Sequence, residues 1–138
     1  MTKVMAFGSF SILHPGHLLY LSEAKKLGDK LIVVLATDSN IEKEKGIKPV
    51  FNQAERLKLI SSLSTVDEAV LGYEDDFFRI VSEKKPDILA LGYDAQCSEA
   101  EMYGKLKENS IEARVVKIRA CTSHKTSAIL NRPLTEKE

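Results

Sequence analysis

Short apolar runs alternate along the chain with longer amphipathic stretches. Most of the apolar runs are continuous and rich in β-branched residues, which is typical of strands buried on both faces of a parallel sheet. This pattern predicts strands at residues 3–8, 30–37, 67–72, 87–92 and 112–118.

The stretches between these runs carry the spacing and the end signals of helices. Residues 15–29 place leucine and alanine side chains on one helical face, and we expect Gly28 to end this helix. A second helix is predicted over residues 53–64, because Asn52 is a good N-cap and Glu55 follows it at the capping-box spacing.

Two more helices are predicted behind polar caps. Asp75 or Asp76 precedes an amphipathic segment at residues 77–85, and Ser98 precedes one at residues 99–110. Strands and helices that alternate at this spacing form βαβ units with right-handed crossovers. We therefore expect the α/β fold class, as a Rossmann-like doubly wound domain with a five-stranded parallel sheet.

Length and charge narrow the choice of function. The 138 residues suit one domain with a proper core, which we place at residues 1–132, followed by a polar tail at residues 133–138. The 20 lysine and arginine residues balance 20 aspartate and glutamate residues, so charge gives no reason to expect a nucleic acid as partner.

Cysteine content and hydropathy both argue against export and against a membrane. Cys97 and Cys121 are too few for the disulfide framework of a small secreted protein, and we expect both thiols to be free. The apolar run near the N-terminus is too short for a signal peptide, and nowhere do about 18 apolar residues run together. The expected setting is the cytoplasm, with no membrane partner.

Candidate chemistry follows the first strand, since ligands of open parallel sheets bind at the carboxyl ends of strands. The candidate residues there are Gly8, Ser9, Phe10, His14, Gly16 and His17. Free N–H groups at a helix start favour an anion, and two imidazoles can donate hydrogen bonds to phosphate oxygens. We predict a phosphate site. Two alternatives stay open: His14 is a loop residue and His17 a core-edge residue, or the pair binds a metal.

The same segment carries a family resemblance. Residues 8–17, GSFSILHPGH, resemble the G-T/S-F-D-x-x-H-x-G-H signature of the small nucleotidyltransferases, which include glycerol-3-phosphate cytidylyltransferase, pantetheine-phosphate adenylyltransferase and archaeal FAD synthase. Further blocks follow in the family's order: FNQAERLKLISSLSTVDEAVLG, DILALGYD and TSHKTSAIL. The segments GYDAQ and HPGHLLYLSEAKKLGD together resemble archaeal FAD synthase most, and Cys121 favours the same resemblance.

The resemblance implies an enzyme that transfers a nucleotidyl group from a nucleoside triphosphate to a phosphate-bearing acceptor and releases pyrophosphate. The expected reaction is FMN plus ATP to FAD, and the choice of FMN rests on the resemblance alone. The resemblance also implies Mg²⁺ or another divalent cation bound with the triphosphate, with no metal-binding residue assigned, and a homodimer.

Two alternative functions remain. One is a glycerol-3-phosphate or sugar-phosphate cytidylyltransferase, because nothing in the composition selects a flavin over a sugar. The other is a non-catalytic nucleotide-binding module. Ser11 favours the latter, since it stands where the family signature has aspartate.

The resemblance further implies roles for single residues. His14 and His17 would hydrogen-bond the α- and β-phosphates, and the backbone N–H groups of Ser9 and Phe10 would line the triphosphate path. Gly92 would admit the base after the fourth strand. Three residues complete the nucleotide contacts, Asp94 at the ribose or base and Thr126 and Ser127 at the β- and γ-phosphates.

Basic residues after the second strand are expected to neutralise the triphosphate. Lys43 and Lys45 lie in a polar segment that we expect to be a flexible loop, although the alternating charges of residues 42–48 are also typical of a solvated turn. Arg56, on the next helix, is expected to grip phosphate with its forked guanidinium, although arginine on a helix surface usually has no such role.

Overall fold

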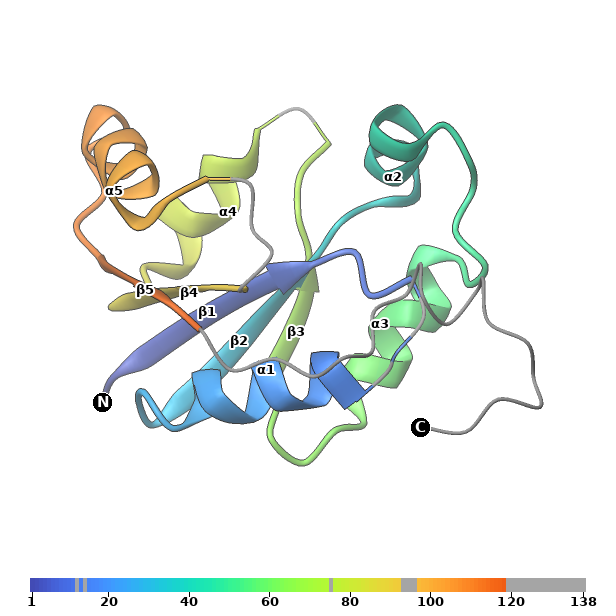
Figure 1. Ribbon diagram of the computed structural model, residues 1–138, viewed down its shortest axis with the longest axis horizontal. Helices are drawn as coiled ribbons and strands as arrows, with labels where there is room; N and C mark the ends of the chain where they lie inside the picture. Colours follow the sequence, from blue (N-terminus) through green and yellow to red (C-terminus); the bar gives the residue numbers. More distant parts are fainter. Residues whose placement is uncertain (12, 14, 75, 93–96, 119–138) are drawn as a thin grey trace.

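The computed structural model describes residues 1–11, 13, 15–74, 76–92 and 97–118, in which parallel strands form a sheet (Figure 1). The order of the five strands is β3-β2-β1-β4-β5. They are β1 (Lys3–Gly8), β2 (Lys30–Leu35), β3 (Glu68–Leu71), β4 (Ile88–Leu91) and β5 (Arg114–Lys117). The predicted α/β fold with its five-stranded parallel sheet is confirmed.

Helices cover both faces of this sheet, which explains the continuous apolar sequence of its strands (Figure 1). The helices are α1 (Pro15–Lys25), α2 (Asp38–Lys45), α3 (Gln53–Ser61), α4 (Phe77–Lys84) and α5 (Glu99–Glu108). Val4 of β1 packs with Leu21 of α1 in one hydrophobic cluster. The adjacent Met5 packs with Val81 of α4 in a second cluster, because successive side chains of a strand point to opposite faces.

The predicted helix starts are confirmed by capping hydrogen bonds. The side chain of Asn52 accepts from the N–H of Glu55 at 2.8 Å, and the Glu55 carboxylate accepts from the N–H of Asn52 at 3.0 Å. The side chain of Ser98 caps α5 by accepting from the N–H of Glu101, and that of Asp76 caps α4 by accepting from the N–H of Phe78. Asp75, the other candidate for the α4 cap, lies outside the described residues.

Gly28 has a different role from the one expected. Helix α1 ends at Lys25, before Gly28 is reached. A Cβ atom on Gly28 would lie 2.8 Å from the carbonyl oxygen of Thr2, and the N–H of Asp29 donates to that same oxygen at 2.8 Å. Glycine is therefore required by the close approach of two backbone segments rather than by the end of the helix.

The expectation of a flexible loop at Lys43 and Lys45 is wrong, because both lie on α2. The helix starts at Thr37, whose side chain accepts from the N–H of Asn40, and ends at Gly46, which has a left-handed φ of 74°. Ile41 is the buried residue of this helix. With so little apolar sequence, the segment shows no helical periodicity, and its polar caps are the signals that define it.

Some expectations concern residues outside the described ranges. These are the domain boundary between residues 132 and 133, and the thiol of Cys121. Within the described ranges, Cys97 is a free cysteine. No helix in that part of the chain combines the length and the apolar character needed to cross a membrane.

Candidate functional site

The sheet opens between β1 and β4 at the carboxyl ends of its strands. Pairing of β1 with β2 continues to Gly8 and Leu35, whereas pairing of β1 with β4 ends at Ala6 and Ala90. The strand order also reverses here, because β2 lies on one side of β1 and β4 on the other. Open α/β sheets bind ligands at such a point, and the turn after β1 leaves the sheet beside it.

The turn after β1 has a strained backbone. Phe10 has a φ of 50°, in the left-handed region that bulky residues rarely adopt. Its ring is buried in the cluster beneath α1 and α3, and lies 3.2 Å from the position that a Cβ atom on Gly8 would take. Strain of this kind costs about 1–3 kcal/mol and persists where the surrounding structure enforces it, as at many functional sites.

His17 lies in the first turn of α1, next to this strained turn. Its side chain is partly buried, and its ring meets the Phe10 ring edge-on, with centroids 5.0 Å apart. No acidic residue lies in the first turn of α1, so no carboxylate of that turn offsets the positive end of the helix dipole. A partly exposed imidazole at such a helix start suits an anion.

The metal alternative gains no support from the described residues. Within them, no three His, Cys, Asp or Glu side chains come close enough together to hold a metal ion. His14, the expected partner of His17, lies outside the described residues.

Lys45 reaches the turn after β1 from α2. Its Nζ donates to the hydroxyl oxygen of Ser9 at 3.4 Å. Lys43 lies in the same last turn of α2, and both lysines are exposed. The structure thus brings one of the two predicted lysines to the predicted phosphate turn, although it comes from a helix end rather than from a loop.

Arg56 is fully buried, in contrast to the surface position that is usual for an arginine on a helix. Its Nη1 donates to the carbonyl oxygens of Ser9 at 2.7 Å and Ala36 at 2.8 Å. Its Nε donates to the carbonyl oxygen of Phe51 at 3.1 Å, and its Nη2 to a carboxylate oxygen of Asp38 at 2.8 Å. Four of the five N–H groups of the guanidinium are therefore bonded to the protein itself.

Asp38 extends this network to the starts of two helices. Its N–H donates to the side chain of Gln53 at 3.0 Å, and its carboxylate accepts from the N–H of Gln53 at 3.1 Å. Burial raises the pKa of Asp38, but the hydrogen bond from Arg56 and that from Gln53 outweigh burial and hold the pKa below its ordinary value. Asp38 thus stays ionised and ties α2 to α3 across the turn after β1.

The remaining candidates are only partly described. Gly92 directly follows β4, on the other side of the opening, and is partly buried. The side-chain oxygen of Ser11 is buried and has no hydrogen-bond partner among the described residues. Asp94, Thr126 and Ser127 lie outside those residues.

Two residues at the site are not predicted from the sequence. Asp38 follows Thr37 at the end of β2, and this pair of capping residues is the signal that indicates a helix start. Tyr20 lies among apolar residues of α1, and its hydroxyl bonds the backbone of both β1 and β4. A tyrosine among apolar helix residues is expected to be buried, and a buried tyrosine usually has a hydrogen-bond partner for its hydroxyl. This is the sequence signal that could have identified Tyr20.

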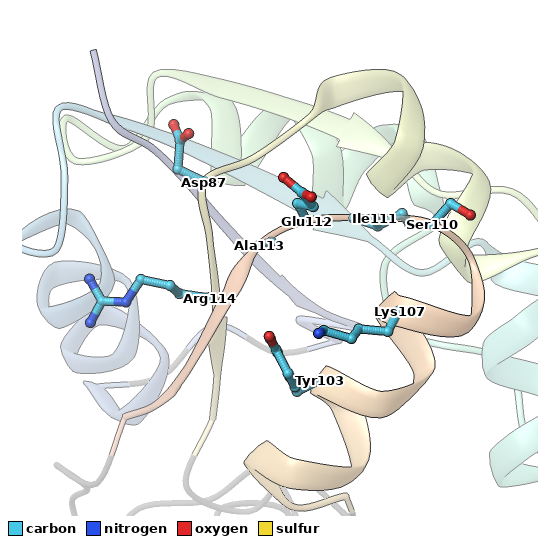
Figure 2. Close-up of a pocket in the computed structure, with 8 residues that line it drawn as sticks. All are labelled: Asp87, Tyr103, Lys107, Ser110, Ile111, Glu112, Ala113 and Arg114. Carbon is cyan, nitrogen blue, oxygen red and sulfur yellow. The ribbon is translucent and has the colours of Figure 1, made fainter.

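A hollow of about 660 Å³ lies at the opposite end of the sheet. Figure 2 shows Tyr103 and Lys107 of α5 on one side of it, and Asp87 and Arg114 at the starts of β4 and β5. Because these are the amino ends of the strands, the hollow is separate from the turn after β1. None of the predicted site residues lines it.

Known proteins match this chain over most of its length. The model of the cytidylyltransferase-like family matches residues 5–133. The FAD synthases of Picrophilus torridus and Thermoplasma acidophilum are each 49% identical to this chain, over 84% and 86% of its length and over 83% and 82% of their own. A crystal structure described as the lipopolysaccharide core biosynthesis protein from Thermoplasma volcanium has a TM-score of 0.83 and 47% identity, and covers 89% of this chain and 99% of that one.

Proposed function

The chain belongs to the cytidylyltransferase-like family, and we propose that it is an FAD synthase, which transfers the adenylyl group of ATP to FMN. The observation that carries this proposal is the 49% identity to FAD synthases over more than four fifths of the chain. The local geometry agrees, because a strained turn, a helix start, an imidazole and a lysine meet at the opening of the sheet.

In this reaction a phosphate oxygen of FMN attacks the α-phosphorus of ATP. A new P–O bond forms while the bond to the β-phosphate oxygen breaks, and pyrophosphate leaves with the electron pair. No side chain is needed as a nucleophile. The protein accelerates such a reaction by placing the two phosphates in line and by stabilising the charge that develops on their oxygens.

His17 and His14 donate hydrogen bonds to the α- and β-phosphate oxygens at the start of α1. The N–H groups of Ser9 and Phe10 line the same path, and Gly8 and Gly16 let the backbone approach the phosphates closely. The strained φ of Phe10 supports this role, because it is a backbone conformation that the surroundings must enforce.

Lys45 and Lys43 supply positive charge from the end of α2. Arg56 has a different task from the one expected, because its fork is bonded to backbone oxygens and to Asp38. It positions the turn after β1 and the start of α2, and thereby Lys45. Gly92 and Asp94 serve the base and ribose, and Thr126 and Ser127 serve the β- and γ-phosphates.

A divalent cation such as Mg²⁺ accompanies the triphosphate in this proposal. Phosphate oxygens and water would supply most of its ligands, as is common for Mg²⁺. When bound, the cation neutralises part of the phosphate charge. The residues of the turn orient the phosphates to which it is bound.

The test is a panel of acceptors and nucleotides. The purified protein with Mg²⁺ is incubated with FMN, glycerol 3-phosphate or a sugar phosphate, each with ATP and with CTP, and pyrophosphate release is measured. We expect release with FMN and ATP, together with FAD identified by chromatography. Riboflavin, which has no phosphate, is the matched negative control. Tight ATP binding without any pyrophosphate release would favour the non-catalytic alternative.

A sugar phosphate is the second candidate acceptor. The description of the Thermoplasma volcanium structure, which names lipopolysaccharide core biosynthesis, favours it. Turnover with a sugar phosphate and none with FMN would establish this alternative in place of FAD synthesis. The homodimer also stays a prediction, and light scattering coupled to gel filtration measures it.

A further inference from the structure

The hydroxyl of Tyr20 lies where β1 and β4 separate. It donates to the carbonyl oxygen of Ala90 at 2.5 Å and accepts from the N–H of Phe7 at 3.3 Å. Ala90 belongs to the last pair of the β1–β4 ladder, opposite Ala6, and Phe7 is the next residue of β1. Tyr20 is 8% exposed, so these hydrogen bonds are made away from solvent.

These contacts join the elements that carry the proposed nucleotide contacts. Phe7 directly precedes the turn that begins at Gly8, and Ala90 lies two residues before Gly92. Tyr20 lies one helical turn after His17 on α1, which places the two side chains on the same side of the helix. One hydroxyl, on the helix that carries the imidazole, therefore contacts the carboxyl-terminal parts of both β1 and β4.

Apolar packing does not fix the position of α1 to the same degree. The other buried residues of α1, Leu21 and Ala24, contribute hydrophobic contacts, which have no preferred direction. A hydrogen bond depends strongly on distance and angle. The two bonds of the Tyr20 hydroxyl thus restrict how far the helix can rotate or slide along the sheet.

We infer that Tyr20 is a positioning residue, whose hydroxyl holds the first turn of α1, and with it His17, at a set distance from both sides of the opening. This inference rests on the proposed function, in which His17 donates to a phosphate. Removing the hydroxyl takes away one partner of the Ala90 carbonyl oxygen. The His17 ring is then free to shift relative to Phe10 and the turn after β1.

The test compares Tyr20→Phe with two controls. Tyr103→Phe removes a hydroxyl from a tyrosine on α5 that is 46% exposed, and Ile80→Val removes one methyl group from the core on the other face of the sheet. Each variant is assayed for kcat and for the KM of ATP in FAD synthesis, and for its Tm. The NMR signals of the His17 ring are assigned in each, since the Phe10 ring next to it makes them sensitive to small shifts.

For Tyr20→Phe we expect kcat to fall about ten- to a hundredfold, because a small misplacement of a catalytic group has effects of that order. The KM of ATP should change little, and the His17 ring signals should move. Tyr20→Phe and Ile80→Val should lower the Tm by similar amounts, but Ile80→Val should not move the His17 ring signals. Tyr103→Phe should behave as the wild type.

Two results would overturn the inference: kcat for Tyr20→Phe that falls no further than for Ile80→Val, or unmoved His17 ring signals. If the variant does not fold, the wild type still provides a test, since a protected Tyr20 hydroxyl proton should show contacts to the Phe7 amide proton. Absence of that contact would refute the proposed position. The NMR measurements do not require turnover, so their outcome is separate from that of the acceptor panel.

Discussion

Two ion pairs connect secondary-structure elements at opposite ends of the sheet, and their surroundings differ. At the carboxyl end, Arg56 has no exposed surface and pairs with Asp38, whose side chain is 35% exposed. At the amino end, Lys25 of α1 pairs with Asp67, which precedes β3, and these side chains are 31% and 38% exposed. The first pair joins helices α3 and α2, and the second joins α1 to the segment that leads into β3.

The difference lies in what else each cation binds. Arg56 also donates to the carbonyl oxygens of Ser9, Ala36 and Phe51, so it holds three backbone segments around the proposed phosphate turn. Lys25 also donates to one carbonyl oxygen, that of Asp29, at the surface. Water can solvate the two partners of the exposed pair when it breaks, but it cannot take the place of the buried Arg56 guanidinium. The carboxyl end therefore depends on its ion pair for its geometry, whereas the amino end does not.

Replacing Arg56 should have the largest effect. Arg56→Met keeps most of the side-chain volume but leaves three partly buried carbonyl oxygens and one oxygen of the Asp38 carboxylate without their guanidinium partner. Breaking a buried pair in this way typically costs about 3–5 kcal/mol of unfolding free energy. Urea unfolding measures the loss, with Arg114→Met, at an exposed position on β5, as the matched control.

The same variant also tests the positioning role of Arg56. We expect FAD synthesis to be impaired even at temperatures where Arg56→Met is fully folded, because the Ser9 carbonyl and the start of α2 are no longer tied together. A folded Arg56→Met variant with wild-type kcat and KM would show that the fork contributes stability alone. A variant that folds normally but has lost all ATP binding would instead favour the direct phosphate grip.

The next largest effect is expected at the phosphate turn itself. His17→Ala should lower kcat about 10²–10³-fold, the usual loss when one hydrogen-bond donor to a developing negative charge is removed. Its Tm should stay close to that of the wild type, because the ring is only partly buried. Leu18→Ala, at the neighbouring residue of α1, which is 45% exposed, is the control. A large fall in Tm with little change in kcat would support the core-edge alternative for His17.

The strands were predictable because burial on both faces leaves a clear trace in the sequence. Val4 and Ala6 face one cluster and Met5 the other, so β1 has no polar position to interrupt its apolar run. Helix α2 lacked such a trace, because Ile41 is its buried residue and the rest is polar. Hydrophobic periodicity therefore predicts the sheet and misses a short helix that is held by its caps.

For the proposed site, the sequence indicates candidate residue types but not their contacts. The turn at Ser9 and the nearby His17 follow from where β1 ends. The burial of Arg56 does not, because three of its four partners are backbone carbonyl oxygens, one of them 47 positions away in sequence, and a carbonyl oxygen has no residue-type signature. The left-handed φ of Phe10 is likewise invisible, since glycine is the residue that usually indicates it.

A smaller effect is expected from the exposed lysines of α2. Lys45→Ala should raise the KM of ATP about tenfold, since it removes one positive charge near the phosphates. A tenfold change corresponds to about 1.4 kcal/mol of binding free energy. Lys43→Ala should raise it less, because the hydrogen bond to Ser9 comes from Lys45. Lys107→Ala, in the last turn of α5, is the matched control.

Steady-state kinetics at low and high salt check this expectation. The difference between Lys45→Ala and the wild type should shrink as salt rises, because exposed charges are screened over about 10 Å at 0.1 M ionic strength. Equal KM values for Lys43→Ala, Lys45→Ala and the wild type at low salt would remove α2 from the proposed nucleotide contacts.

The smallest effect is expected at the amino-end pair. Lys25→Met should lower the unfolding free energy at pH 7 by about 0.2–1 kcal/mol, as is usual for exposed ion pairs. The hydrogen bond from Lys25, together with that from the N–H of Leu31, lowers the pKa of Asp67 from its ordinary value of 3.8. This contribution is therefore complete above about pH 4 and is lost as the pH falls through the lowered pKa of the folded state.

Urea unfolding at pH 7 and near pH 2 should show the difference between wild type and variant disappearing in acid, with Lys26→Met, which is far more exposed, as the control. A loss as large as that of Arg56→Met would mean that exposure does not decide what an ion pair contributes in this fold.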